Sequence, residues 1–216
     1  MSKHLKEIQR SLHYTTISFE QIGSSQTGEE LRRAWENYVD QFGKTIGQLI
    51  TAANSEQATK GWGHRLKQSS AHDDEGLVYL REARNVSQHG LVPFGDYFEP
   101  SVVIGNGAIS IGGTSKNITI SNITENGVKI VGSPINFDTR NGRIEKFRGH
   151  RPSRMRELPA QVRLGTITSE QKKKSFHFPK SVKGKPLDDT APLTLARVAL
   201  RVLTEIVDDF EKVSSD

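Results

Sequence analysis

The chain has 216 residues, 34% of them hydrophobic, and a formal net charge of +5, which suits one sizeable domain or two small ones. No apolar run approaches the ~20 residues of a membrane-spanning helix, and the first residues lack the apolar core of a signal peptide. The absence of Cys excludes disulfides and thiolate metal sites, so we expect a cytoplasmic protein with no membrane partner.

The first quarter of the chain has helical spacing. Residues 3–20 form a short amphipathic pattern that ends before Gly23-Ser24-Ser25. Thr27 and Glu30 then occupy the positions of a capping box, in which each side chain bonds to the other residue's backbone N–H. The helix behind them has one apolar face, which we expect to pack in the core: Leu31, Trp35, Tyr38, Phe42, Ile46, Leu49, Ile50 and Ala53.

Residues 54–72 are expected to form a polar connection, and this segment contains Trp62 between Gly61 and Gly63. An exposed Trp in such a loop could stack on a nucleic-acid base. Alternatively, Trp62 could pack from the loop onto a helical bundle, and we favour this structural interpretation.

A further helix is predicted from about residue 74 to residue 89. The acids at its start, Asp73 to Glu75, suit the unpaired backbone N–H groups of a helix N-terminus. Gly90 can adopt the left-handed conformation that ends a helix, and Pro93 prevents easy continuation. The acids could also hold a divalent ion, but a helix start explains them more simply.

This helix contains the residues with the clearest chemical potential: Arg84, Asn85 and His89. Arg84 and His89 are five residues apart, which separates them by ~140° around a helix axis and ~7.5 Å along it. They would act together only in a cleft, and a second copy of the same helix could form its other wall.

The pattern Arg, polar residue, three further residues and His, late in a bundle helix, resembles the HEPN superfamily. The match runs from Arg84 through Asn85 to His89. The resemblance implies a helical bundle with a metal-independent endoribonuclease site shared across a dimer interface. It also implies a role in toxin–antitoxin, anti-phage or stress systems, with RNA and a possible antitoxin or regulatory protein as partners. Other members of the superfamily have lost catalysis and bind nucleotides or partner proteins.

Metal-free RNA cleavage requires a proton donor or acceptor near neutral pH and positive charge on the phosphate. His89 suits the first role and Arg84 the second, while Asn85 would position either side chain or the phosphate. The alternative is structural: Arg84 pairs with Glu82 or another acid, Asn85 is exposed, and His89 caps the helix end.

After Pro93 the pattern becomes that of short strands. Asn-Gly, a strong signal for a tight hairpin turn, occurs at Asn106-Gly107, Asn126-Gly127 and Asn141-Gly142. We expect an antiparallel meander of about six strands: Ser101–Gly105, Ala108–Gly112, Asn117–Ile123, Val128–Gly132, Ile135–Thr139 and Arg143–Phe147.

Positive charge is concentrated between Arg140 and Pro186, where 14 Lys and Arg face 3 acids, whereas the remaining chain has 16 bases and 22 acids. Such a segment is typical of a polyanion-binding surface, although a solvated loop has the same composition. Phe147, Phe176 and Phe178 could stack on RNA bases, or the last two could form the buried face of a strand. The candidate RNA-binding residues are Arg148, Arg151, Arg154, Arg156, Lys172, Lys173 and Lys174.

The last helix begins near Pro192 and has an apolar stripe that it cannot bury alone, so we expect it to return to the N-terminal helices. The predicted fold is therefore α+β: a HEPN-like helical bundle with an inserted antiparallel β-meander before the C-terminal helix. The expected domains are residues 1–98 plus 187–216 for the bundle, 99–150 for the β insertion, and 151–186 for a basic, loop-rich connection.

Two functional hypotheses remain. The first is a dimeric HEPN-type endoribonuclease, and the second is a non-catalytic HEPN-like bundle that binds a partner protein or nucleic acid. The seven His residues lack the paired spacing of zinc ligands, so we expect no metal and no cofactor.

Overall fold

The computed structural model describes residues 3–89, 95–98, 101–104, 109–112, 115–120, 124–125, 128–129, 135–140, 143–148, 155–158, 161–169 and 173–215. It combines helices with small antiparallel sheets, as expected for the α+β class. The chain divides into two compact units. The helical unit contains Met1–Ser24, Arg32–Asp96 and Val162–Asp216, and the β unit contains Ser25–Leu31 and Tyr97–Gln161.

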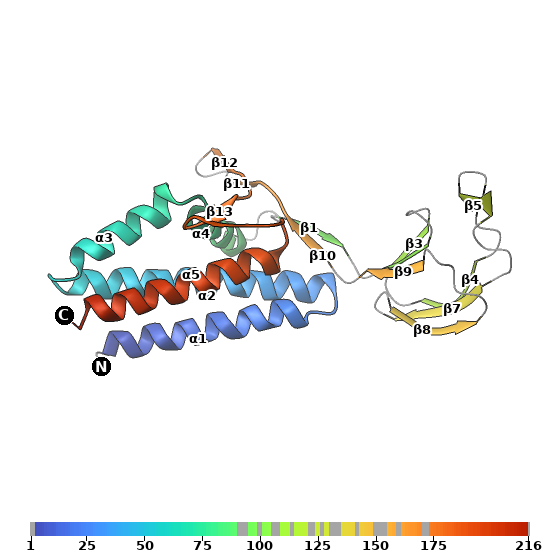
Figure 1. Cartoon of the computed structure of the whole chain (residues 1–216), viewed down its shortest axis with the longest axis horizontal. Coiled ribbons are helices and arrows are strands. Elements are labelled where there is room, and N and C mark those ends of the chain that lie inside the picture. The colour runs from blue at the N-terminus through green and yellow to red at the C-terminus, as the bar shows by residue number, and fades with distance from the viewer. Residues whose placement is uncertain are drawn as a thin grey trace. The chain divides into compact units, whose positions relative to one another are not determined.

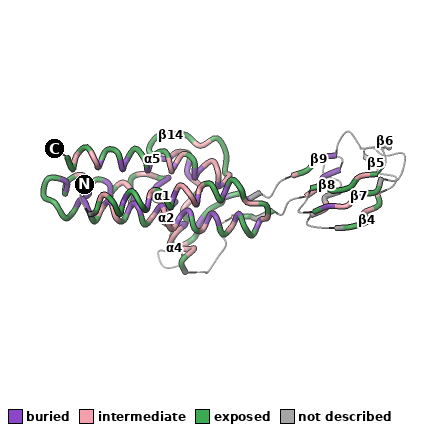
Figure 2. The backbone as a smooth tube through the Cα atoms, turned by 90° about the horizontal axis from the view of Figure 1, so that it is seen from below, coloured by how far each residue is buried: buried purple, intermediate pink, exposed green. Residues whose placement is uncertain are grey.

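The long helices of the helical unit run side by side (Figures 1 and 2). They are α1 (Lys3–Ser24), α2 (Gly28–Ser55) and α5 (Pro192–Val213). The shorter helices are α3 (Lys60–Gln68), a π-helical turn η1 (Ser69–Asp73) and α4 (Glu75–His89). Trp35, Tyr38 and Leu49 are fully buried, which confirms that the apolar face of α2 forms the core.

The C-terminal helix returns to the N-terminal helices as predicted. Its buried residues include Leu195, Ala199 and Leu203, and the Tyr38 hydroxyl of α2 donates a hydrogen bond to the Ala196 carbonyl of α5 at 2.9 Å. Burial raises the pKa of the Tyr38 phenol well above its ordinary value of 10.0. This bond therefore joins α2 to α5 within the apolar core.

Both predicted helix starts are confirmed in atomic detail. At α2, the Glu30 N–H donates to Thr27 Oγ1 at 3.1 Å, and the Thr27 N–H donates to Glu30 Oε2 at 3.2 Å. At α4, the Leu77 N–H donates to Asp74 Oδ1 at 2.8 Å, so Asp74 caps the helix that carries the candidate residues.

The prediction that residues 54–72 form a polar connection is wrong, because most of this segment is helical in α3 and η1. Its glycines suggested a loop, but Gly63 allows α3 to approach α2 closely: an added Cβ would lie 2.7 Å from Ala53 Cβ. Trp62 lies on α3 and packs on Phe210 of α5 at 5.1 Å between ring centroids. Its indole N–H donates to Asp209 at 3.1 Å, so Trp62 has the structural role that was favoured.

Short strands lie along the chain before α5, and two of them contact α4. They are β10 (Gln161–Leu164), β11 (Ile167–Ser169), β12 (Lys174–Phe176), β13 (Ser181–Val182) and β14 (Lys185–Pro186). The Tyr79 hydroxyl donates to the Gly165 carbonyl at 2.9 Å, and Glu75 Oε1 accepts from the Lys180 N–H at 2.9 Å. A region expected to be a loop-rich connection thus contains two hairpins, β11–β12 and β13–β14, in contact with α4. Strand β1 (Gly95–Phe98) pairs with β10.

The β unit has two three-stranded antiparallel sheets, in the orders β3-β2-β9 and β4-β7-β8, and a small hairpin β5–β6. Buried Val102, Ile104, Phe137 and Met155 from both sheets form one hydrophobic cluster. The strands are β2 (Ser101–Ile104), β3 (Ile109–Gly112), β4 (Ser115–Ile120), β5 (Thr124–Glu125), β6 (Val128–Lys129), β7 (Ile135–Arg140), β8 (Arg143–Arg148) and β9 (Met155–Leu158).

The three Asn-Gly pairs lie outside the described residues, but the strands on either side of each pair are antiparallel partners, as predicted for hairpins. The simple meander order is wrong, however, because β4 pairs with β7 and β9 returns to pair with β2. The return of β9 brings Met155 opposite Ile104, where both residues are buried in the shared cluster.

Candidate functional site

Arg84 projects from α4 toward α2, where it meets an acid that the sequence did not identify. Arg84 Nε donates to Asp40 Oδ1 at 3.0 Å, and Gln88, one turn later on α4, donates to the same oxygen at 2.9 Å. The two side chains of the ion pair are 32% and 41% exposed, so solvent reaches both. Asp40, and not Glu82, is therefore the acid that pairs with Arg84.

The arginine reaches Asp40 by passing over Gly43. A Cβ added at residue 43 would lie 2.4 Å from Arg84 Cδ and 3.1 Å from Arg84 Nε. Real Cβ atoms do not approach other atoms so closely, so only glycine lets the arginine lie flat on α2 at this point. Asp40 and Gly43 lie one turn apart on α2 and together define the position of Arg84.

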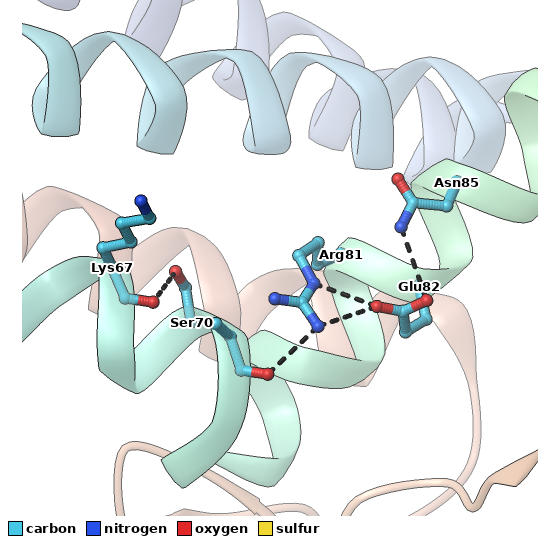
Figure 3. Close-up of polar contacts among 6 residues, drawn as sticks. Lys67, Ser70, Arg81, Glu82 and Asn85 are labelled. Atoms are coloured by element: carbon cyan, nitrogen blue, oxygen red, sulfur yellow. Dashed lines mark hydrogen bonds and ion pairs between the residues drawn. The ribbon is translucent and has the colours of Figure 1, made fainter. Parts of the chain in front are cut away.

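Asn85 belongs to a second, more buried group of contacts on α4 (Figure 3). Its amide donates to Glu82 Oε2 at 3.4 Å, and the Glu82 side chain is only 1% exposed. The other carboxylate oxygen of Glu82 accepts from Arg81 Nε at 2.9 Å, while Arg81 Nη2 donates to the Ala71 carbonyl at 3.0 Å. Asn85 is half-buried and not exposed, because this network holds it.

His89 is the last residue of α4, and its side chain lies outside the described residues. Because α4 is continuous from Glu75 to His89, the expected separation of ~140° from Arg84 follows from regular helix geometry. Gly90 and Pro93, which were predicted to end this helix, also lie outside the described residues.

The described candidate RNA-binding residues are divided between the two units. Arg148 and Arg156 are exposed on strands β8 and β9 of the β unit. Lys173 and Lys174 are exposed in the helical unit, where Lys174 Nζ lies 5.3 Å from the ring centroid of Phe176. Arg151, Arg154 and Lys172 lie outside the described residues.

Two of the aromatic residues considered for base stacking have structural contacts. Phe147 stacks on Phe137 within the β unit, with ring centroids 6.3 Å apart. Phe178 makes an edge contact with Tyr79 of α4 at 5.6 Å. Their rings therefore contribute to packing, and a base would have to displace these contacts to stack on them.

A cavity of about 270 Å³ lies next to Arg84, between α2, the α3–η1 segment and α4. Its walls are largely apolar and include Phe42, Ile46, Ile50 and Leu77. Three cationic side chains also line it: Lys67, Arg81 and Arg84. The candidate arginine thus borders a largely apolar hollow that is open to solvent on one side.

Asp40, Gln88 and Lys67 were missed by sequence reasoning because their importance depends on tertiary proximity. Asp40 lies 44 residues before Arg84, and nothing in the local pattern of α2 distinguishes it from other solvated acids. The one available signal was the pair Gly43 and Gly47 inside a strong helical pattern, since glycine is unfavourable there without a packing reason.

Comparison of the chain with protein-family models, with curated proteins and with solved structures gave no match. Within the described residues, no three His, Asp or Glu side chains lie close enough to hold a metal ion. None of the helices in the described part of the chain is long and apolar enough to cross a membrane.

Proposed function

We propose that this protein is a metal-independent endoribonuclease of HEPN type, with Arg84, Asn85 and His89 as its catalytic residues. One observation carries the proposal: Asp40 holds Arg84 by its inner nitrogen, Nε. Among the residues that the structure describes, the two terminal nitrogens of Arg84 have no hydrogen-bond partner. A guanidinium held through Nε keeps both terminal nitrogens available as donors, and these can bind two oxygens of one phosphate.

The chemistry needs no external cofactor. The ribose 2′-oxygen attacks the adjacent phosphorus and loses its proton to a base, while the bond from phosphorus to the 5′-oxygen breaks and that oxygen gains a proton. His89 would take or supply one of these protons, and Arg84 would stabilise the charge that develops on the phosphate. The products are a 2′,3′-cyclic phosphate and a 5′-hydroxyl.

The proposed active form is a homodimer. Side chains ~140° apart on one helix face different directions, so a single copy of α4 does not gather Arg84 and His89 on one face. Two copies of α4 placed side by side would let Arg84 of one protomer meet His89 of the other. A toxin–antitoxin, anti-phage or stress role, with an antitoxin or other regulatory partner, remains part of this proposal.

Basic residues on both units would add affinity for RNA without adding sequence preference. The exposed Arg148 and Arg156 of the β unit and the exposed Lys173 and Lys174 of the helical unit suit phosphate contacts. Binding that depends on such contacts weakens steeply as salt concentration rises.

A non-catalytic bundle that binds a partner protein or nucleic acid is the second candidate, and the Arg84–Asp40 ion pair favours it. In that role the arginine would be a structural cation that already has its counterion. The two candidates differ in whether Asp40 orients Arg84 for a phosphate or neutralises it.

Cleavage of mixed RNA in excess EDTA tests the proposal. Wild type, His89→Ala and Arg84→Ala would be compared, with His64→Ala as the matched control because His64 is an exposed histidine on α3. We expect wild type and His64→Ala to produce cyclic-phosphate ends, and the other two variants to lose at least a hundredfold in rate. Equal cleavage by all four proteins would place the activity elsewhere, and absence of cleavage by wild type would favour the binding bundle.

A further inference from the structure

The cavity beside Arg84 has an apolar lining that the proposed catalytic step does not require. Phosphate binding at Arg84 needs an open surface, whereas this cavity is a hollow of about 270 Å³ with an apolar lining. Pockets for drug-sized ligands span roughly 300–1,000 Å³, so the space suits a group somewhat smaller than such a ligand. A single nucleobase with part of its sugar is of this size.

Two glycines of α2 line the hollow, and one of them leaves open space beside it. Gly43 and Gly47 lie one turn apart, and both line the cavity. A Cβ added at residue 47 would meet no atom within 4 Å, so the space beside Gly47 is open. Glycine inside a helix costs about 1 kcal/mol relative to alanine, and at position 47 no close packing contact accounts for that cost.

The electrostatic character of the lining favours an anion at one side of the cavity. Lys67, Arg81 and Arg84 are the charged residues that line it, and no acid is among the described lining residues. The Arg81 guanidinium forms an ion pair with Glu82. Lys67 Nζ, in contrast, has no ion-pair or hydrogen-bond partner among the described residues. Figure 3 shows the Lys67 side chain extending from α3 toward α2, away from its own backbone contact with Ser70.

We propose that this cavity is the base-binding subsite of the ribonuclease: one unstacked base of the RNA enters the apolar hollow, and its phosphate contacts Arg84 and Lys67. The inference rests on the proposed function, because it assigns the occupant to the RNA that Arg84 would bind. Apolar and aromatic side chains such as Ile46 and Phe42 are the surroundings in which an extruded base is commonly held. The consequence is a preference for certain bases beside the cleaved bond, set by the shape of this hollow.

Binding can be measured separately from cleavage. The four nucleoside 3′-monophosphates would be titrated by calorimetry into wild type and Gly47→Leu in EDTA, with Asn37→Leu as the matched control. Asn37 is exposed on α2 and does not line the cavity, so its variant adds the same side chain elsewhere on the same helix. Leucine at residue 47 would extend into the open space, and we expect it to weaken binding of the preferred nucleotide at least tenfold.

A second pair of variants tests the phosphate contact. Lys67→Gln should weaken the 3′-monophosphate several-fold and leave the unphosphorylated nucleoside unchanged, whereas Lys60→Gln, exposed at the start of α3, should change neither. Because both lysines are exposed, these variants remain informative if leucine at residue 47 prevents folding. Ribose 5-phosphate and decanoate are the competitors that test whether the base itself is bound.

The outcomes separate this inference from the proposed function. Nucleotide binding that Gly47→Leu or Lys67→Gln weakens supports the subsite, even if the protein fails to cleave RNA. Cleavage whose base preference is identical in wild type and Gly47→Leu would overturn the subsite while leaving the nuclease intact. Undetectable binding of all four nucleotides, or competition by ribose 5-phosphate or decanoate at equal strength, would also overturn it.

Discussion

Arg81 and Arg84 lie three residues apart on α4, yet their surroundings differ in kind. Arg81 pairs with Glu82, whose side chain is 1% exposed, and it also binds the Ala71 carbonyl. Arg84 pairs with Asp40, whose side chain is 41% exposed, and donates through Nε alone among the described residues. The two arginine side chains are about equally exposed, at 33% and 32%, so the contrast lies in their acids: one is buried and the other is reached by solvent.

The energetics of the two pairs predict different roles. Removing one partner of a buried ion pair leaves an uncompensated charge and typically costs about 3–5 kcal/mol. An exposed pair contributes about 0–1 kcal/mol, since water screens it. The Arg84–Asp40 pair therefore contributes little to the free energy of unfolding. A role in positioning Arg84 for a ligand is consistent with this small contribution.

The largest expected effect is on stability at Arg81. Arg81→Ala leaves the buried Glu82 carboxylate without its arginine, so we expect the free energy of unfolding to fall by about 3 kcal/mol. Arg84→Ala should lower it by less than about 1 kcal/mol. Urea denaturation of both variants against wild type measures this difference directly.

A double variant tests whether the unpaired Glu82 charge causes the loss of stability in Arg81→Ala. Replacing Arg81 by Met and Glu82 by Leu removes both charges of the buried pair, so it should recover much of the stability that Arg81→Ala loses. If Arg81→Ala and Arg84→Ala prove equally stable, the two ion pairs do not differ as the burial of their acids suggests.

The next prediction concerns the glycine under Arg84. Gly43→Ala would place Cβ 2.4 Å from Arg84 Cδ, so the arginine has to leave its place on α2. We expect RNA cleavage to fall at least tenfold, while the free energy of unfolding changes by less than about 1 kcal/mol, because alanine favours the helix. Gly61→Ala is the control, since its nearest contact would be an ordinary 3.8 Å. A variant Gly43→Ala with full activity would contradict the proposed position of Arg84.

A smaller effect is expected at Asp40. Asp40→Ala removes the acceptor for both Arg84 and Gln88, so we expect kcat to fall several-fold with little change in stability. Asp40→Asn keeps an oxygen acceptor and should restore part of that loss. Rates for both variants on one RNA, with kcat and KM separated, identify Asp40 as a positioning residue. An increase in cleavage or RNA affinity in Asp40→Ala would instead mean that Asp40 neutralises Arg84.

Local pattern predicted the parts of this molecule that depend on neighbours in sequence. The capping box of Thr27 and Glu30, the acidic cap of α4 and the Asn-Gly hairpins were all predicted, because each requires only a few adjacent residues. The order of strands in the β unit was not, since the pairing of β9 with β2 joins residues more than 50 positions apart. Helix α3 was missed because Gly63, typical of loops, serves close packing instead.

In the candidate site, too, the sequence predicts local spacing but not contacts between distant residues. The spacing from Arg84 to His89 is visible in the sequence, but Asp40, which holds Arg84, comes from another helix. Glu82 was considered as a partner of Arg84, but it is buried and pairs with Arg81, which also binds the Ala71 carbonyl of η1. Tertiary contacts thus decide which of several similar charged residues become structural and which stay open to a ligand.

The smallest expected effect comes from an exposed ion pair away from α4. Lys185 donates a hydrogen bond to Glu205, and this bond, with help from Arg201, lowers the pKa of the Glu205 carboxyl below its ordinary value. A carboxyl with a lowered pKa in the folded state adds stability above its unfolded pKa and loses it as the pH falls through the folded pKa. Between neutral pH and pH 3, the Tm of wild type should therefore decline slightly more than that of Glu205→Gln, which has no proton to gain. If the Tm of both proteins declines equally, the Lys185–Glu205 pair adds no measurable stability. Stability would then be a still weaker explanation for the exposed Arg84–Asp40 pair, and a functional role for it would gain support.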